Sequence, residues 1–114
     1  MHRDQTYLLD ILSEARALAL FVKDVTYAEF IADARTRRAV ERSFEIIGEA
    51  SKAISKDFRD SHPEFPWRWM ADMRNLIIHE YRKVNYAVLW ETIRHDIPDI
   101  TRLIEPLVPP EDVE

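Results

Sequence analysis

Hydrophobic residues recur at three- and four-residue steps through most of the chain, which is the period of one face of an α-helix. The first run of this kind predicts a helix from about residue 5 to 23, with Asp4 as its N-cap. Its apolar face consists of Leu8, Ile11, Leu12, Ala15, Leu18, Ala19 and Val22.

A short helical piece and a second long helix are expected next. Thr26 or Tyr27 opens the short piece, TYAEFIAD, and Asp33 is placed to cap a long helix over residues 34 to 56. The same helical period continues in the apolar positions of this long helix, which are Ala39, Val40, Phe44, Ile47, Ala50 and Ile54.

The segment DFRDSHPEFP, residues 57 to 66, breaks the pattern with two prolines, a serine and three acidic residues. This composition predicts a loop. Pro66 suits the first turn of a following helix, which is expected to run to about His79 or Tyr81.

Asn85 is expected to cap the last helix, after the short polar link RKV. Pro98 interrupts that helix and predicts a kink, or a break near His95–Asp96 with Asp96 capping the second piece. An acidic tail from about residue 107 follows a proline-rich helix end. The chain is therefore predicted to be one all-α domain, residues 1–114, an up-and-down bundle of four main helices plus short helical pieces.

The composition agrees with a helical domain and bears on where the protein works. Gly48 is the single glycine, which disfavours an all-β fold with its many tight turns. The chain contains no cysteine, so disulfides and thiolate metal sites are excluded. The longest apolar run, Ala17 to Val22, is too short to span a membrane, and MHRDQTYLLD lacks a signal-peptide core. A cytoplasmic protein is expected.

The formal net charge of −5 disfavours binding of nucleic acid through bulk charge, so any such contact needs a local basic patch. One candidate is a stripe of three arginines at helical spacing. These arginines either pair with glutamates on the same helix or extend a track for phosphates. The arginines are Arg35, Arg38 and Arg42, and the glutamates are Glu41, Glu45 and Glu49.

The stretch MRNLIIHEY, residues 73 to 81, combines buried-helix character with polar groups. On a helical wheel, residues 67 to 81 are apolar nearly all round, which predicts a central helix buried on several sides. The exceptions form two stripes. One contains Asp72, Asn75 and His79, and the other contains Arg74 and Tyr81.

A buried guanidinium needs compensation, because an unpaired buried charge is very costly. In one interpretation Arg74 pairs internally with Glu45 or Glu49, and His79 bonds to a backbone carbonyl. In the other, these groups line a cleft or a subunit interface that receives an anion. Gly48 either permits close helix packing, the interpretation favoured here, or opens space beside the site.

The order Arg74-Asn75, three residues, His79, one residue, Tyr81 resembles the motif of the HEPN superfamily, and more narrowly that of its HepT-like branch of ribonuclease toxins. Two longer segments are also similar to that branch. They are FEIIGEASKAIS at 44–55 and PWRWMADMRNLIIHEYRKVNYAVLWETIRHDIP at 66–98. The resemblance covers most of the chain.

This resemblance implies a metal-independent endoribonuclease that works through a 2′,3′-cyclic phosphate, without a cofactor. Arg74 and His79 would be catalytic, with Asn75 and Tyr81 in support, and two protomers would pair so that two motifs face one cleft. The residue types suit this chemistry, because histidine titrates near neutral pH and arginine binds phosphate oxygens in pairs. HE at 79–80 lacks the second histidine of a zinc protease, so no metal site is expected.

The resemblance further implies a toxin of a type II/VII-like toxin–antitoxin pair, with an MntA-like nucleotidyltransferase as antitoxin. That partner would silence the toxin by attaching AMP to Tyr81. The alternative is a non-catalytic HEPN module that binds a nucleotide or the nucleotidyltransferase. The two hypotheses separate at His79, because binding can survive its loss whereas cleavage cannot.

Overall fold

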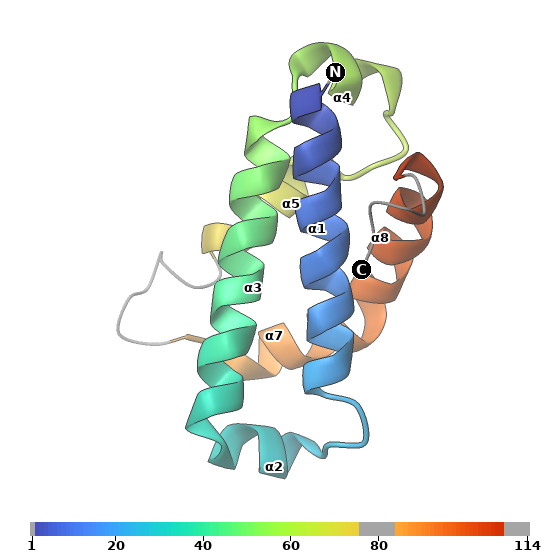
Figure 1. Ribbon diagram of the computed structural model, residues 1–114. Helices are drawn as coiled ribbons and strands as arrows, with labels where there is room; N and C mark the ends of the chain where they lie inside the picture. The colour runs from blue at the N-terminus through green and yellow to red at the C-terminus, as the bar shows by residue number, and fades with distance from the viewer. Residues whose placement is uncertain (1, 76–83, 109–114) are drawn as a thin grey trace.

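Two long helices lie side by side in opposite directions and form the centre of the computed structural model, which describes residues 2–75 and 84–108 (Figure 1). They are α1, His2–Phe21, and α3, Ala34–Ala53. Helix α8, Ile97–Ile104, packs on α1, while α5, Trp67–Ala71, and the 3₁₀ turn η1, Asp72–Arg74, pack on α3.

Short helical pieces connect these elements or follow the last of them. They are α2, Tyr27–Ala32; α4, Lys56–Ser61; α7, Tyr86–Glu91; the π-helical turn η2, Thr92–Asp96; and the 3₁₀ turn η3, Glu105–Leu107. No strand occurs in the described residues, and the predicted all-α bundle is confirmed.

The core consists of the inward faces of α1, α3 and α8 together with buried side chains from the shorter pieces, among them Phe30 and Met70. The predicted apolar face of α1 is buried at five of its seven positions, and that of α3 at five of six. Buried side chains of the core include Leu8, Ile11, Leu12, Ala15, Leu18, Val40, Phe44, Ile47, Ala50, Ile54, Ile97, Ile100 and Ile104.

Three of the predicted helix starts are confirmed by their capping contacts. Thr26 and Glu29 form a reciprocal capping box at α2. The Asp33 carboxylate accepts bonds from the first turn of α3, and its hydrogen bonds with Thr36 hold the pKa of this carboxyl below its usual value. The Asn85 side chain accepts from the Val88 amide at 3.2 Å.

The prediction that Asp4 caps the first helix is wrong, because α1 already begins at His2. Its buried carboxylate instead accepts bonds from the Ser55 amide at 2.9 Å and the Ser55 hydroxyl at 2.7 Å. Ser55 in turn caps α4 by accepting from the Phe58 amide. This long-range tie fixes the point where the chain leaves α3, and a local sequence pattern contains no sign of it.

The loop predicted over residues 57 to 66 is wrong in its first half, which forms most of α4. α3 ends at Ala53, earlier than expected, because Ile54 leaves the helical conformation with ψ 138°, and its side chain is buried in the core. Phe58 stacks on His62 with ring centroids 4.4 Å apart. One aromatic contact and one serine cap therefore order a segment whose polar composition is typical of a loop.

The break predicted near His95–Asp96 is not found, because the backbone stays helical through Pro98 and Asp96 makes no side-chain cap. The chain instead widens into η2, where the Ile97 amide donates to the Thr92 carbonyl, five residues back. Proline has no N–H for the bond that an α-helix needs at this position, and the π-helical turn keeps the backbone helical up to it.

The last helical element of the described residues ends at Leu107, close to the predicted start of the acidic tail; the tail from residue 109 lies outside those residues. Within the described ranges, no helix has the length and hydrophobicity needed to cross a membrane.

Candidate functional site

Arg74 lies at the end of η1, where the segment after Pro66 passes closest to α3. Met70 and Met73 are fully buried and anchor this segment to the core. The helix predicted from Pro66 is confirmed as far as the described residues reach, since residues 67 to 75 are helical with the 3₁₀ turn η1 inside the run. The burial on several sides predicted for this helix is not found at Trp69, which is 38 % exposed.

Gly48 makes the close approach of α3 to Arg74 possible. A Cβ atom on Gly48 would lie 2.8 Å from the Arg74 backbone nitrogen, 3.0 Å from the Arg74 Cβ and 3.1 Å from the Ala71 carbonyl oxygen. Two of these neighbours are backbone atoms, so they cannot rotate away. The interpretation of Gly48 as a residue that permits close packing is supported, and the packing it permits is that of Arg74 itself.

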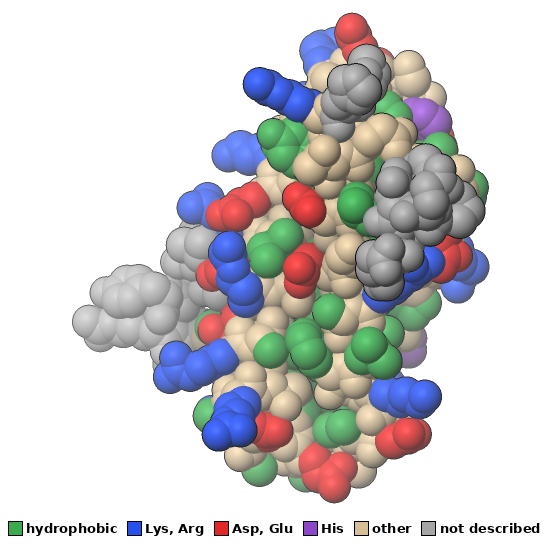
Figure 2. Space-filling model, viewed as in Figure 1, with side chains coloured by type: hydrophobic (Ala, Val, Ile, Leu, Met, Phe, Trp, Pro, Cys, Tyr) green, Lys and Arg blue, Asp and Glu red, His purple; other side chains and the backbone are tan. Residues whose placement is uncertain are grey.

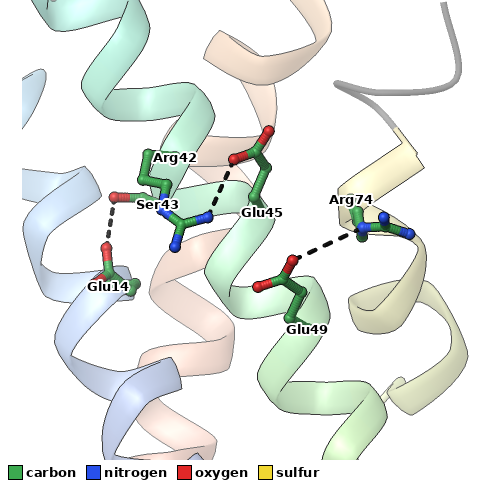
Figure 3. Close-up of polar contacts among 6 residues, drawn as sticks. All are labelled: Glu14, Arg42, Ser43, Glu45, Glu49 and Arg74. Carbon is green, nitrogen blue, oxygen red and sulfur yellow. Dashed lines mark hydrogen bonds and ion pairs between the residues drawn. The ribbon is translucent and has the colours of Figure 1, made fainter.

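Glu49, the next residue of α3, carries the carboxylate that Arg74 faces (Figure 3). The Arg74 Nε and the Glu49 Oε2 are 3.9 Å apart, which is an ion pair but too long for a hydrogen bond. Nε is buried and has no hydrogen-bond partner among the described residues, although the whole side chain is 43 % exposed. Of the two glutamates proposed from the sequence, the structure pairs Arg74 with Glu49.

The remaining motif residues are only partly within the described structure. Asn75 follows Arg74 directly and is exposed. His79 and Tyr81 lie outside the described residues, so their distances to Arg74 and the two predicted polar stripes stay predictions.

The arginine stripe of α3 lies on the surface, and Figure 2 shows basic and acidic side chains interspersed along the α3 edge. Arg42 pairs with Glu45 at 3.4 Å. Arg35 and Arg38 are exposed and form no ion pair with the described residues. The predicted pairing within the helix is thus found for one arginine of the three.

Glu41 has a different partner from the arginine expected for it. Its carboxylate accepts a hydrogen bond from the Tyr86 hydroxyl of α7. Burial, together with this bond, raises the pKa of Tyr86 above its usual value. Arg37 lies over the same ring, 5.5 Å from its centroid. Sequence reasoning missed this cluster because it joins residues 45 positions apart.

The three tryptophans differ in burial. Trp90 belongs to the core, and Trp67 donates its indole N–H to the His62 carbonyl at 2.9 Å. Trp69 and Pro66 line two surface hollows, the smaller of about 220 Å³, and Arg74 lines neither of them. The smaller hollow is lined by Pro66, Trp69, Asp96, Asp99, Ile100 and Leu103.

A metal site needs several ligands in one place. In residues 2–75 and 84–108, no group of three or more histidine, aspartate or glutamate side chains is arranged to hold an ion. Beside the close contact between α3 and η1, the Arg74 guanidinium and the Glu49 carboxylate form an ion pair.

The all-α bundle, with Arg74 at the end of η1, Asn75 directly after it, and His79 and Tyr81 following in the sequence, defines a helical domain of the HEPN type. The chain belongs to the HepT-like ribonuclease family, whose model matches residues 11–107.

Relatives from archaea and bacteria match almost end to end. A Thermococcus cleftensis protein named "Probable ribonuclease HepT" is 44% identical over 93% of this chain and 94% of its own. "Putative RNase MJ1380" of Methanocaldococcus jannaschii is 43% identical over 89% and 93%. "Putative RNase TTE0752" of Caldanaerobacter subterraneus subsp. tengcongensis is 41% identical over 95% and 96%. No solved structure matches the chain.

Proposed function

We propose that this protein is an endoribonuclease in which Arg74 binds the scissile phosphate and His79 transfers protons. The observation that carries the proposal is the state of Arg74. Its side chain is 43 % exposed, its buried Nε has no hydrogen-bond partner among the described residues, and its backbone is fixed against Gly48. Such a group can take an anion without first breaking a strong internal bond. The ribonuclease names of the relatives agree with this function.

The chemistry needs few protein groups, because RNA supplies its own nucleophile. A base removes the proton of the 2′-hydroxyl, and the 2′-oxygen attacks phosphorus. The bond from phosphorus to the 5′-oxygen breaks, and an acid protonates that oxygen, which leaves a 2′,3′-cyclic phosphate. His79 suits the proton transfers, and Arg74 neutralises the charge that grows on the phosphate oxygens. Asn75 orients the phosphate, and Tyr81 donates a hydrogen bond or stacks on a base.

The need for both a base and an acid in the reaction leads us to expect a homodimer. One histidine does not readily act as base and acid in the same turnover, whereas two copies facing one cleft supply two His79 and two Arg74. The exposed arginines Arg35, Arg38 and Arg42 then extend the contact with RNA phosphates along α3. Arg35 and Arg38 are the stronger candidates, because both are exposed and neither forms an ion pair with the described residues, whereas Arg42 pairs with Glu45.

The purified protein is expected to cleave single-stranded RNA in the presence of EDTA, because no step of this scheme uses a metal. The products should carry 2′,3′-cyclic phosphate ends, or the phosphate ends that form from them by hydrolysis, as identified by mass spectrometry. The active species should sediment at twice 13.5 kDa. Strict dependence on added Mg²⁺, or full activity in a monomer, would contradict the scheme.

The same proposal includes silencing by a nucleotidyltransferase antitoxin that attaches AMP to Tyr81. An attached AMP brings negative charge and bulk near Arg74, where the RNA phosphate binds. Tyr86, five residues further on, is a poor acceptor. Its hydroxyl already donates to Glu41, and its raised pKa makes the phenolate harder to form.

Co-expression with the cognate nucleotidyltransferase is expected to add mass in AMP increments and to abolish RNA cleavage. Tyr81→Phe should prevent both changes, whereas Tyr86→Phe should leave the modification in place. Peptide mass spectrometry locates the adduct. AMP on Tyr86, or an unmodified Tyr81 beside an active partner, would contradict this part of the proposal without affecting the ribonuclease part.

A further inference from the structure

Glu49 is an unusual neighbour for a phosphate-binding arginine, because a carboxylate beside the site repels the substrate's negative charge. Its Oε2 lies 3.9 Å from the Arg74 Nε, and the two side chains approach from different elements, α3 and η1 (Figure 3). No other side chain pairs with the Arg74 guanidinium in the described part of the protein.

We propose that Glu49 is a positioning residue that orients Arg74 for phosphate binding. This inference rests on the proposed function. A guanidinium presents two edges that can each form paired hydrogen bonds, one through Nε and one Nη, the other through both Nη atoms. Glu49 lies at the Nε edge, so a carboxylate that closes on it leaves the pair of Nη atoms to hold two phosphate oxygens.

The local structure allows this closure. The Arg74 Nε is buried and has no hydrogen-bond partner among the described residues, while the Glu49 side chain is 56 % exposed and has room to move. Closing the distance by about 1 Å would bring the pair to ordinary hydrogen-bond length. Because Gly48 sets the α3 backbone directly against that of Arg74, neither end of the pair can drift far.

The other glutamates on this side of α3 have partners of their own. Glu45 binds Arg42, and Glu41 accepts from Tyr86. Glu45 therefore offers a matched control. It is a glutamate of the same helix, one turn earlier, and its ion pair does not involve Arg74 (Figure 3).

Positioning and simple charge repulsion predict opposite results for variants of Glu49. If Glu49 only repels RNA, its neutralisation should lower KM and leave kcat unchanged. If it orients Arg74, kcat should fall, because the oriented guanidinium acts most strongly on the charge that grows in the transition state.

The variants are ranked by geometry rather than by charge. Glu49→Gln keeps an acceptor oxygen at the same reach, so kcat should fall only a few-fold. Glu49→Asp keeps the charge but is one methylene shorter, so it should behave like Glu49→Ala, with kcat reduced by about tenfold to 100-fold. Glu45→Gln should keep kcat within about twofold of the wild-type value. In an Arg74→Lys background, which lacks the Nε–H, loss of Glu49 should have little further effect.

A second measurement does not depend on activity. The Nε–H signal of Arg74 in a ¹⁵N–¹H spectrum is identified by its loss in Arg74→Lys. It should shift and exchange faster with water in Glu49→Ala, and it should be unchanged in Glu45→Gln. If the wild-type protein cleaves no RNA, the proposed function fails, and this comparison still decides whether Glu49 orients Arg74.

The inference is overturned by any of three results. One is a kcat for Glu49→Ala at the wild-type value, and another is Glu49→Asp as active as wild type while Glu49→Gln is not. The third is an Arg74 Nε–H signal that is identical in wild type and Glu49→Ala. A Glu49→Ala protein that melts like the wild type confirms that its loss of activity does not come from unfolding.

Discussion

Replacing His79 with alanine is expected to reduce RNA cleavage by about 100-fold or more while the protein stays folded, because general acid–base catalysis contributes effects of that size. RNA binding should persist, since the phosphate contact belongs to Arg74. The measurements are initial rates on a labelled RNA, affinity by gel shift, and thermal melting by circular dichroism. Arg74→Ala should lose both cleavage and most of the affinity.

Arg74→Lys separates charge from geometry. Lysine keeps the positive charge but cannot hold two phosphate oxygens at once, so cleavage should remain well below wild type while RNA affinity partly recovers. His95→Ala is the matched histidine control. His95 is exposed on η2 and contacts Glu91 at 3.0 Å, four residues back, and its loss should leave the rate within about twofold.

Two outcomes would overturn the catalytic assignment. Full cleavage by His79→Ala would remove His79 from the mechanism. A wild-type protein that binds RNA or nucleotide but never cleaves RNA would favour the alternative of a non-catalytic binding module. In that case His79→Ala should bind like the wild type.

The sequence predicted the fold well where the information is local. Asp33, Thr26 and Asn85 were identified as caps because a cap needs only a side-chain oxygen and the next few amides. Where a contact spans the chain, prediction failed. The hydrogen bonds between Asp4 and Ser55 join residues 51 positions apart, and they give the Asp4 carboxylate a partner at the start of α4 instead of the predicted role as cap of α1.

The candidate site was predictable in its residue types but not in its contacts. The spacing of Arg74 and Asn75 to His79 pointed to the motif, yet two glutamates were equally acceptable partners for Arg74 in the sequence. Their distinction depends on how far α3 slides against η1, and that register is set by the contact at Gly48. Periodicity reports which face of a helix is buried, not which turn meets which neighbour.

Because the contact at Gly48 sets the position of α3 against η1, we expect Gly48→Ala to have a large effect on both stability and activity. Alanine favours a helix over glycine by about 1 kcal/mol, so in an open site the change would stabilise α3. Here the new methyl group would lie 2.8 Å from the Arg74 nitrogen and 3.1 Å from the Ala71 carbonyl oxygen. Overpacking of this kind typically costs about 1–3 kcal/mol, and the two backbone contacts place this site toward the upper end.

We therefore expect Gly48→Ala to lower the melting temperature by about 4 °C or more, which corresponds to a net loss of about 1 kcal/mol in a domain of this size. Ser51→Ala is the matched control. Ser51 is buried one turn further along α3, and its hydroxyl has no hydrogen-bond partner among the described residues, so its removal should not destabilise the protein.

Gly48→Ala should also lower the rate of RNA cleavage, even at temperatures where the variant is folded. The methyl group pushes on the backbone of Arg74, and a displacement of up to 1 Å at a phosphate-binding group can reduce the rate by about 100-fold. Assayed below its melting transition, Gly48→Ala should cleave RNA at least about tenfold more slowly than Ser51→Ala. A Gly48→Ala protein that melts at or above the wild-type temperature and cleaves normally would mean that α3 and η1 can separate without cost. The close approach would then not be what holds Arg74 in place.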